Sequence, residues 1–422
     1  MELSIYLCIG VVLGFSVIFL VSGELSHKTG LTKPNRYILA CFLSFGVMGL
    51  AVKSITLLLL QAGPVLKEVV DTSRGSGTYT HSGTVLVQGI EYPVLLKSWQ
   101  TLPPQDIESS KPQLIEFGRK LFFDVRLSST QTVSCASCHV IGLGGDDGKA
   151  VSSGINGKKG NRNSPSVLNV TFLKKFFWDG RARSLEDQVL GPLTNPVEMG
   201  LSSASEVVEI VSNVPEYVNM YENLFNNPVE FQGIALALAA FERSLITYDA
   251  PFDRFVRGDK SALSAKQIKG MILFDKIGCR QCHRDPYFSV AGMENASPFR
   301  SFPVFKGSPY VEKYDLARDK GLNGHGVWRV PSLRNVAQTA PYFHNGGVTT
   351  LSEAVKVMAT AQLGLKISEL AEDDFQIRYD GNNQLMVTQD RALNGAEIEE
   401  IVAFLTALSA TPPKILNPWI KS

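Results

Sequence analysis

Two short segments of the sequence share the pattern Cys-x-x-Cys-His. Its six residues are Cys135, Cys138, His139, Cys279, Cys282 and His283. The pattern attaches a c-type haem, because cysteines at this spacing reach the two vinyl groups on one porphyrin edge. The histidine that follows presents its imidazole to the iron as proximal ligand. A redox cysteine pair would not need both histidines, and one zinc ion would use only four of the six ligands. The sequence therefore predicts two covalently bound haem c groups.

The two motifs belong to a longer internal repeat. Before them, "GRKLFFD" at 118–124 matches "GMILFDK" at 270–276. After them, "SPSVLNV" at 164–170 matches "VPSLRNV" at 330–336. The register then continues without a gap for about twenty residues, which predicts two homologous haem domains that fold alike.

The two copies differ where a sixth iron ligand is expected. In this register Trp178 corresponds to His344, and the residues fourteen positions later are Pro192 and Met358. A methionine so placed predicts a His/Met haem, an electron-transfer centre whose potential the thioether raises. Proline has no donor side chain. The first haem is therefore expected to keep an open face that can bind a small molecule.

The loop at 190–203 takes the place of the missing ligand. It carries one ionisable group, Glu198. A carboxylate above an open haem can move a proton between the two oxygens of hydrogen peroxide, although a solvated glutamate without a role is the alternative. Trp178 is either a core aromatic or, given its correspondence to His344, a residue at the haem edge facing the other domain.

The first 62 residues differ in composition from the rest. Residues 3–21 carry no charge, and residues 37–60 carry only Lys53. Each run is long enough to cross a bilayer as a helix. The loop between them is basic, which predicts that it lies in the cytoplasm and that both ends of the hairpin lie outside. No signal-peptide cleavage site ends either run.

These patterns predict an all-α fold with two cytochrome c-like domains in tandem, preceded by an N-terminal transmembrane helical hairpin. The expected parts are a membrane anchor at 1–62, a tether with a short β-hairpin at 63–111, a first haem domain at 112–255 and a second at 256–422. The formal net charge of +1 gives no reason to expect nucleic acid as a partner.

The motifs resemble the bacterial dihaem cytochrome c peroxidases, members of the MauG-like superfamily. The similar segments are "FFDVRLSS", "SCASCH", "NSPSVLN", "FWDGRARSLEDQ", "GPLTNPVEMG", "APFDRF", "GCRQCH", "VPSLRN", "TAPYFHNGG" and "LSEAVKVM". The resemblance runs from about Pro112 to Leu408. It implies reduction of hydrogen peroxide to water at the N-terminal haem, with electrons from a high-potential C-terminal haem.

The resemblance also implies roles for single residues. The implied iron ligands are His139, His283 and Met358, the catalytic residues are Glu198 and Trp178, and the ligands of one calcium ion are Asn163, Thr339 and the carbonyl of Pro341. Oxygen ligands of this kind suit calcium. The implied electron donor is a small redox protein, cytochrome c or cupredoxin, or a quinol-linked membrane donor. Family members are often homodimers.

Haem attachment outside the cytoplasm and the predicted anchor together place the protein in the bacterial inner (cytoplasmic) membrane, with its haem domains in the periplasm. Two other functions stay open. A MauG-like dihaem oxidase would act on a protein substrate, but the resemblance implies a tyrosine in that group where this chain has Met358. A dihaem electron carrier without catalysis would not need Glu198 or the gap at Pro192.

The loop after the first motif leads to a testable difference from many family members, which block the peroxidatic iron with a histidine from this loop. Residues 144–166 contain no histidine, and Ile155 stands at the corresponding position. His325 is the other extracytoplasmic candidate and is expected in a surface loop. We predict that the diferric protein has an open first haem and needs no reductive activation. Electron paramagnetic resonance of the oxidised protein should show one high-spin haem, whereas two six-coordinate low-spin haems would contradict this.

Overall fold

The computed structural model describes residues 84–87, 90–93, 99–103, 112–367, 377–379, 385–387 and 392–420. All of them fall in one unit, residues 75–422. The predicted hairpin at 1–62 and most of the tether lie outside the described residues, so both stay predictions. Within the described ranges, no helix combines the length and apolar character needed to cross a membrane.

Helices dominate the described part of the chain, as expected for haem domains. Around the first motif lie α3 (Pro112–Phe122), α4 (Cys135–Cys138), α5 (Leu185–Thr194), α6 (Ala204–Ser212), α7 (Pro215–Phe225) and α8 (Phe231–Ser244). Around the second lie α9 (Pro251–Val256), α10 (Ala265–Lys276), α11 (Pro309–Lys313), α12 (Leu351–Val357) and α13 (Gly395–Thr406).

The described strands are short and form four separate pairs. Three pairs are antiparallel: β1 (Thr84–Val87) with β2 (Ile90–Pro93), β3 (Phe299–Ser301) with β4 (Val327–Arg329), and β6 (Ile377–Tyr379) with β7 (Leu385–Val387). The fourth pair, β5 (Lys366–Ile367) with β8 (Ala392–Leu393), is parallel. The first pair confirms the hairpin predicted in the tether. Of the four, only β3 and β4 contribute to the site described below.

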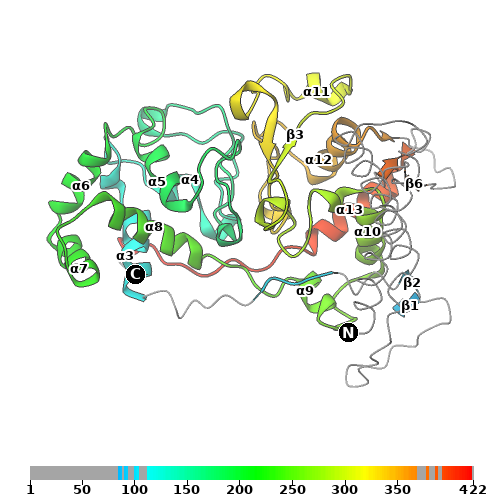
Figure 1. Cartoon of the computed structure of the whole chain (residues 1–422), viewed down its shortest axis with the longest axis horizontal. Helices are drawn as coiled ribbons and strands as arrows, with labels where there is room; N and C mark the ends of the chain where they lie inside the picture. The colour runs from blue at the N-terminus through cyan, green and yellow to red at the C-terminus, as the bar shows by residue number, and fades with distance from the viewer. Residues whose placement is uncertain are drawn as a thin grey trace, which may run out of the picture. The chain divides into compact units, whose positions relative to one another are not determined.

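Each copy of the repeat is built on one crossing of two helices. Figure 1 shows α3 beside α8 in the first copy and α10 beside α13 in the second. Gly118 and Gly270, which the repeat aligns, sit at the two crossings. A Cβ atom would lie 1.9 Å from the carbonyl oxygen of Ala237 at the first and 1.8 Å from that of Glu400 at the second. Both glycines are therefore required for close backbone contact.

The repeat register predicted from sequence is confirmed by equivalent local conformations. Asn169 and Asn335 both adopt a left-handed backbone, each with φ of 61°. Both donate a side-chain hydrogen bond of 2.8 Å to the hydroxyl oxygen of Thr247. The helices that follow also begin alike, since Ser184 caps α5 and Thr350 caps α12. Pro192 and Met358 are consequently the eighth residues counted from equivalent helix starts.

Two segments pack on parts of the chain outside their expected domains. Trp99, placed in the tether by the sequence, is buried against Phe252, Phe288 and Phe404 of the second half. Near the C-terminus, the indole nitrogen of Trp419 donates to the carbonyl oxygen of Lys120 on α3 at 3.1 Å. Since Phe252 also belongs to the second core, the break between the cores precedes α9, a few residues before the predicted boundary at 255.

We predict that the buried ion pair between Arg334 and Asp253 is important for stability. The two groups share hydrogen bonds of 2.6 and 2.9 Å, and both side chains are 2% exposed. Asp253→Asn should lower the free energy of unfolding by about 3 kcal/mol, because it leaves a buried guanidinium without its counter-charge. Glu399→Gln, which removes one charge of an exposed ion pair with Lys266, should lower the free energy of unfolding by less than about 1 kcal/mol. If denaturant unfolding gave the two variants equal losses of unfolding free energy, this prediction would be wrong.

Candidate active site

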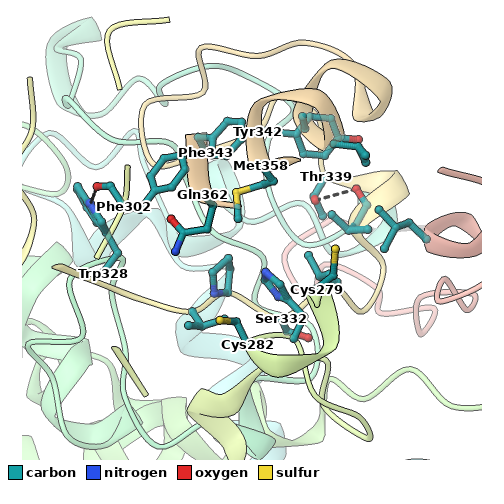
Figure 2. A pocket seen from close by; sticks show the side chains of 18 of the residues that line it. Cys279, Cys282, Phe302, Trp328, Ser332, Thr339, Tyr342, Phe343, Met358 and Gln362 are labelled. Atoms are coloured by element: carbon teal, nitrogen blue, oxygen red, sulfur yellow. Dashed lines mark hydrogen bonds between the residues drawn. The ribbon is translucent and has the colours of Figure 1, made fainter. Parts of the chain in front are cut away.

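The second Cys-x-x-Cys-His motif lines an apolar cavity that also contains Met358. Figure 2 shows the Met358 sulfur pointing into this cavity, across from Cys279 and Cys282. His283 is buried, and its Nδ1 lies 3.2 Å from the carbonyl oxygen of Phe288. A proton on Nδ1 leaves Nε2 as the ring nitrogen able to bind a metal. Burial lowers the pKa of His283 to about 4, so the ring is neutral at physiological pH.

These residues fit a covalently attached haem. His283 and Met358 would hold the iron, and the two cysteines would form the thioether bonds. Burial raises the pKa of Cys279 to about 12, which is opposite to the shift that a redox-active thiolate requires. None of the four motif cysteines forms a disulfide bond. In the described part of the chain, no three His, Cys, Asp or Glu side chains converge as a metal site of their own.

Met358 lies where the helix geometry changes. Thr350 caps α12, which gives way after Val357 to a π-helical turn at Met358–Gln362. Short π-helical segments occur often at functional sites, because the extra residue in the turn reorients the side chains. The sequence placed Met358 by register, but nothing in it indicated this turn.

The first motif has the same proximal arrangement. The Nδ1 atom of His139 lies 3.2 Å from the carbonyl oxygen of Gly145 and 3.2 Å from the hydroxyl of Ser164. Burial lowers the pKa of His139, and it raises the pKa values of Cys135 and Cys138. The residues therefore fit a second haem with His139 as proximal ligand. At the position equivalent to Met358, Pro192 lies inside α5 and offers no ligand.

Glu198 lies in the loop between α5 and α6, close to the first motif. Its charge contributes to the raised pKa values of both Cys135 and Cys138, so the carboxylate lies within electrostatic range of the first motif. Its Oε1 accepts a hydrogen bond of 2.7 Å from the side chain of Asn195. The side chain is solvent-accessible, yet partial desolvation still raises its pKa against the lowering effects of Asn195 and Arg181.

The loop after the first motif packs against the Glu198 loop. Ile155 is buried, and its backbone N–H donates to the carbonyl oxygen of Glu198 at 2.9 Å. The Nζ atom of Lys158 donates to the carbonyl oxygen of Pro196 at 3.1 Å. Position 155 therefore supports the backbone that carries Glu198 and provides no iron ligand. His325 lies exposed at the end of a short turn, as the sequence led us to expect.

Trp178 and His344 each form a hydrogen bond with the same residue, Asn163. The Trp178 indole nitrogen donates to the Asn163 carbonyl oxygen at 2.9 Å, and the Asn163 backbone N–H donates to the His344 carbonyl oxygen at 2.7 Å. The His344 ring stacks on Trp328, with 4.1 Å between the ring centroids. Two hydrogen bonds therefore connect the equivalent residues of the two copies across the junction.

The three expected calcium ligands lie around one cavity. Asn163, Thr339 and Pro341 all line the cavity that contains Met358. Asn163 donates its side-chain N–H to the carbonyl oxygen of Lys149 at 2.8 Å, which directs its amide oxygen elsewhere. The structure thus brings these positions together, and calcium binding stays a prediction.

Sequence reasoning missed two residues of this region. Asn195 precedes Glu198 by three residues in "NPVEMG", a spacing that suits a side-chain contact within a turn. Arg329 in "WRVP" also lines the haem cavity, and no local pattern indicated its burial.

Comparisons with known proteins agree with this arrangement. The family model of the di-haem cytochrome c peroxidases matches residues 112–261. Cytochrome c551 peroxidase of Pseudomonas aeruginosa is 40% identical over 314 residues, which cover 72% of this chain and 81% of that protein. Cytochrome c551 peroxidase of Nitrosomonas europaea is 36% identical over 325 residues, which cover 75% and 86%.

A solved structure supports the same relationship. A MauG-like protein associated with microbial copper homeostasis aligns with a TM-score of 0.60 and 26% identity, over 76% of this chain and 98% of the other. The curated relatives and the shared fold together show that the chain belongs to the di-haem cytochrome c peroxidase family.

Proposed function

We propose that this protein is a di-haem c-type peroxidase that reduces hydrogen peroxide to two molecules of water, consuming two electrons and two protons. The C-terminal haem, held by His283 and Met358, would supply the electrons, and the N-terminal haem, held by His139, would supply the redox chemistry on peroxide. One observation carries the proposal: Met358 points into the second haem cavity, whereas the equivalent Pro192 offers no ligand. One haem is thus suited to electron transfer, and the other to binding peroxide.

Glu198 is the proton-transfer group of the proposed reaction. Bound haem supplies the redox chemistry, while the Glu198 carboxylate takes a proton from one peroxide oxygen and returns it to the departing oxygen. Partial desolvation raises its pKa toward the working pH, which makes it an effective acid after it has acted as base. Asn195 orients the carboxylate by donating to Oε1.

Trp178, Asn163 and His344 provide the proposed route for electrons between the haems. Their two hydrogen bonds form a short and continuous path across the junction. Asn163, Thr339 and the carbonyl of Pro341 would hold a calcium ion at this same junction. Such an ion would keep the two halves in register.

We further propose that residues 1–62 anchor the protein in the bacterial inner membrane, with the haem domains in the periplasm. The support for this is the length and charge pattern of the two apolar runs. A small cytochrome c or cupredoxin, or a quinol-linked membrane donor, would supply the electrons. A homodimer is the expected assembly by analogy with the family.

Two alternative functions have less support. The MauG-like oxidase is disfavoured by the Met358 sulfur in the cavity. A pure electron carrier is disfavoured by Pro192 and by the partly desolvated carboxylate of Glu198.

Removal of the Glu198 carboxylate tests the proposed reaction. Glu198→Gln should lower peroxide turnover by at least about 100-fold, the usual contribution of a general acid–base group. Glu206→Gln is the matched control, because Glu206 contacts only Ser202 and Ser203 at the start of α6. Turnover should be measured on samples with equal haem content. Equal rates for Glu198→Gln and wild type would refute the peroxidase assignment.

The pH dependence tests the role of Asn195. As pH falls, protonation removes the base form of Glu198, so kcat/KM for peroxide should decline at a pH above the usual glutamate pKa. The Asn195 hydrogen bond lowers this pKa, so Asn195→Ala should move the decline to higher pH. Thr194→Val, whose hydroxyl bonds only the Leu190 carbonyl, should leave the profile unchanged. A decline that stays in place in Asn195→Ala would contradict this assignment.

A further inference from the structure

Arg329 is a buried cation in the wall of the haem cavity. It ends β4 and is 5% exposed. A charged group is stable in such a place only when an opposite charge and hydrogen bonds replace the lost water. The partners of Arg329 therefore decide what the residue does.

Within the described residues, the Arg329 guanidinium has only carbonyl partners. Its Nε donates to the carbonyl oxygen of Phe177 at 3.0 Å, and its Nη1 donates weakly to that of Val330 at 3.4 Å. Asp179 is the one carboxylate whose charge acts on Arg329, and it hydrogen-bonds instead to Arg162 and Arg181. Burial accordingly lowers the pKa of Arg329 to about 10.

Arg334, five residues later in the sequence, is a buried arginine that is paired with a carboxylate. It is equally buried and holds Asp253 through two hydrogen bonds of 2.6 and 2.9 Å. Arg329 has no such carboxylate among the described residues, but it does line the cavity that fits the C-terminal haem. Haem carries two propionate carboxylates.

The attachment chemistry indicates where those carboxylates lie. Cys279 and Cys282 hold the vinyl edge of the porphyrin, and the propionates project from the opposite edge. Figure 2 shows Trp328, the residue next to Arg329 on β4, across the cavity from Cys279. Strand β4 is thus on the side that a propionate would reach.

We propose that Arg329 binds a propionate of the C-terminal haem and thereby raises its reduction potential. An arginine can pair with a carboxylate through two parallel hydrogen bonds, which makes it suited to this ligand. The inference depends on the proposed function, since it requires haem in this cavity.

The same arginine touches the turn that carries Trp178. Its backbone N–H donates to the Trp178 carbonyl oxygen at 2.9 Å, and its Nε contacts the preceding carbonyl of Phe177. A propionate bound at Arg329 would therefore fix β4 against the tryptophan of the other copy. Arg329 is in this sense a positioning residue for electron transfer between the haems.

The test uses the full-length protein with both haems attached. Arg329→Gln removes the cation and should lower the midpoint potential of the His/Met haem in a spectroelectrochemical titration. It should also shift the propionate bending mode in resonance Raman spectra toward weaker hydrogen bonding. Arg329→Lys keeps the charge, so it should retain most of the potential while still shifting the Raman mode. This second variant covers the case in which Arg329→Gln fails to fold.

Arg318→Gln is the matched control. Arg318 belongs to the same half of the chain, does not line the cavity, and its side chain is 84% exposed beside Asp315. Solvent screens its charge, so this variant should change the potential much less. An unchanged potential and Raman mode in Arg329→Gln, at full haem content, would overturn the proposal. If the absorption spectrum of the wild-type protein lacked the far-red band of methionine-ligated haem, the proposed function itself would be refuted.

Discussion

One threonine hydroxyl holds the two copies of the repeat in register. Thr247 is buried, and its oxygen accepts one hydrogen bond from Asn169 and one from Asn335, which matches its two lone pairs. Each asparagine turns its chain through a left-handed residue into the segment that ends at Trp178 or His344. The approach of these two residues through Asn163 depends on this shared contact point.

The two copies of the repeat differ at few positions, and the proposed division of roles between them depends on those positions. The helix crossings at Gly118 and Gly270 and the proximal histidine contacts are equivalent in the two copies. The difference lies on the opposite face of each haem site, where α5 carries Pro192 and the end of α12 carries Met358. A proline inside a helix lacks a backbone donor as well as a ligand atom. The first copy instead uses the loop after α5 to bring in Glu198.

Charge distribution at the junction links the proposed roles of several residues. Arg162 of the first half binds Asp179 of its own half and Asp319 of the second half, at 2.7 Å in each case. This network joins the halves and also engages Asp179, the carboxylate whose charge acts on Arg329. Among the described residues, Arg329 hydrogen-bonds only to carbonyls and lines the cavity proposed for haem, which is itself an anionic group. Assembly of the junction and recognition of the haem are therefore connected.

The sequence by itself determined the features that depend on spacing along the chain. It predicted the haem motifs, the proximal histidines, the repeat register and, through that register, the contrast between Met358 and Pro192. Haem attachment and helix starts are local, so a short pattern is enough to specify them. The π-helical turn at Met358 is also local, but no residue pattern signals it.

Only the tertiary structure decided which distant residues meet. The path from Trp178 to His344, the burial of Trp99 in the second core and the carbonyl-only environment of Arg329 join segments far apart in sequence. The cost of burying a polar or charged group depends on every neighbour that replaces water, and those neighbours exist only after folding. The same reasoning applies to Glu198, which the sequence singled out, but whose pKa desolvation raises while the Asn195 hydrogen bond opposes that shift.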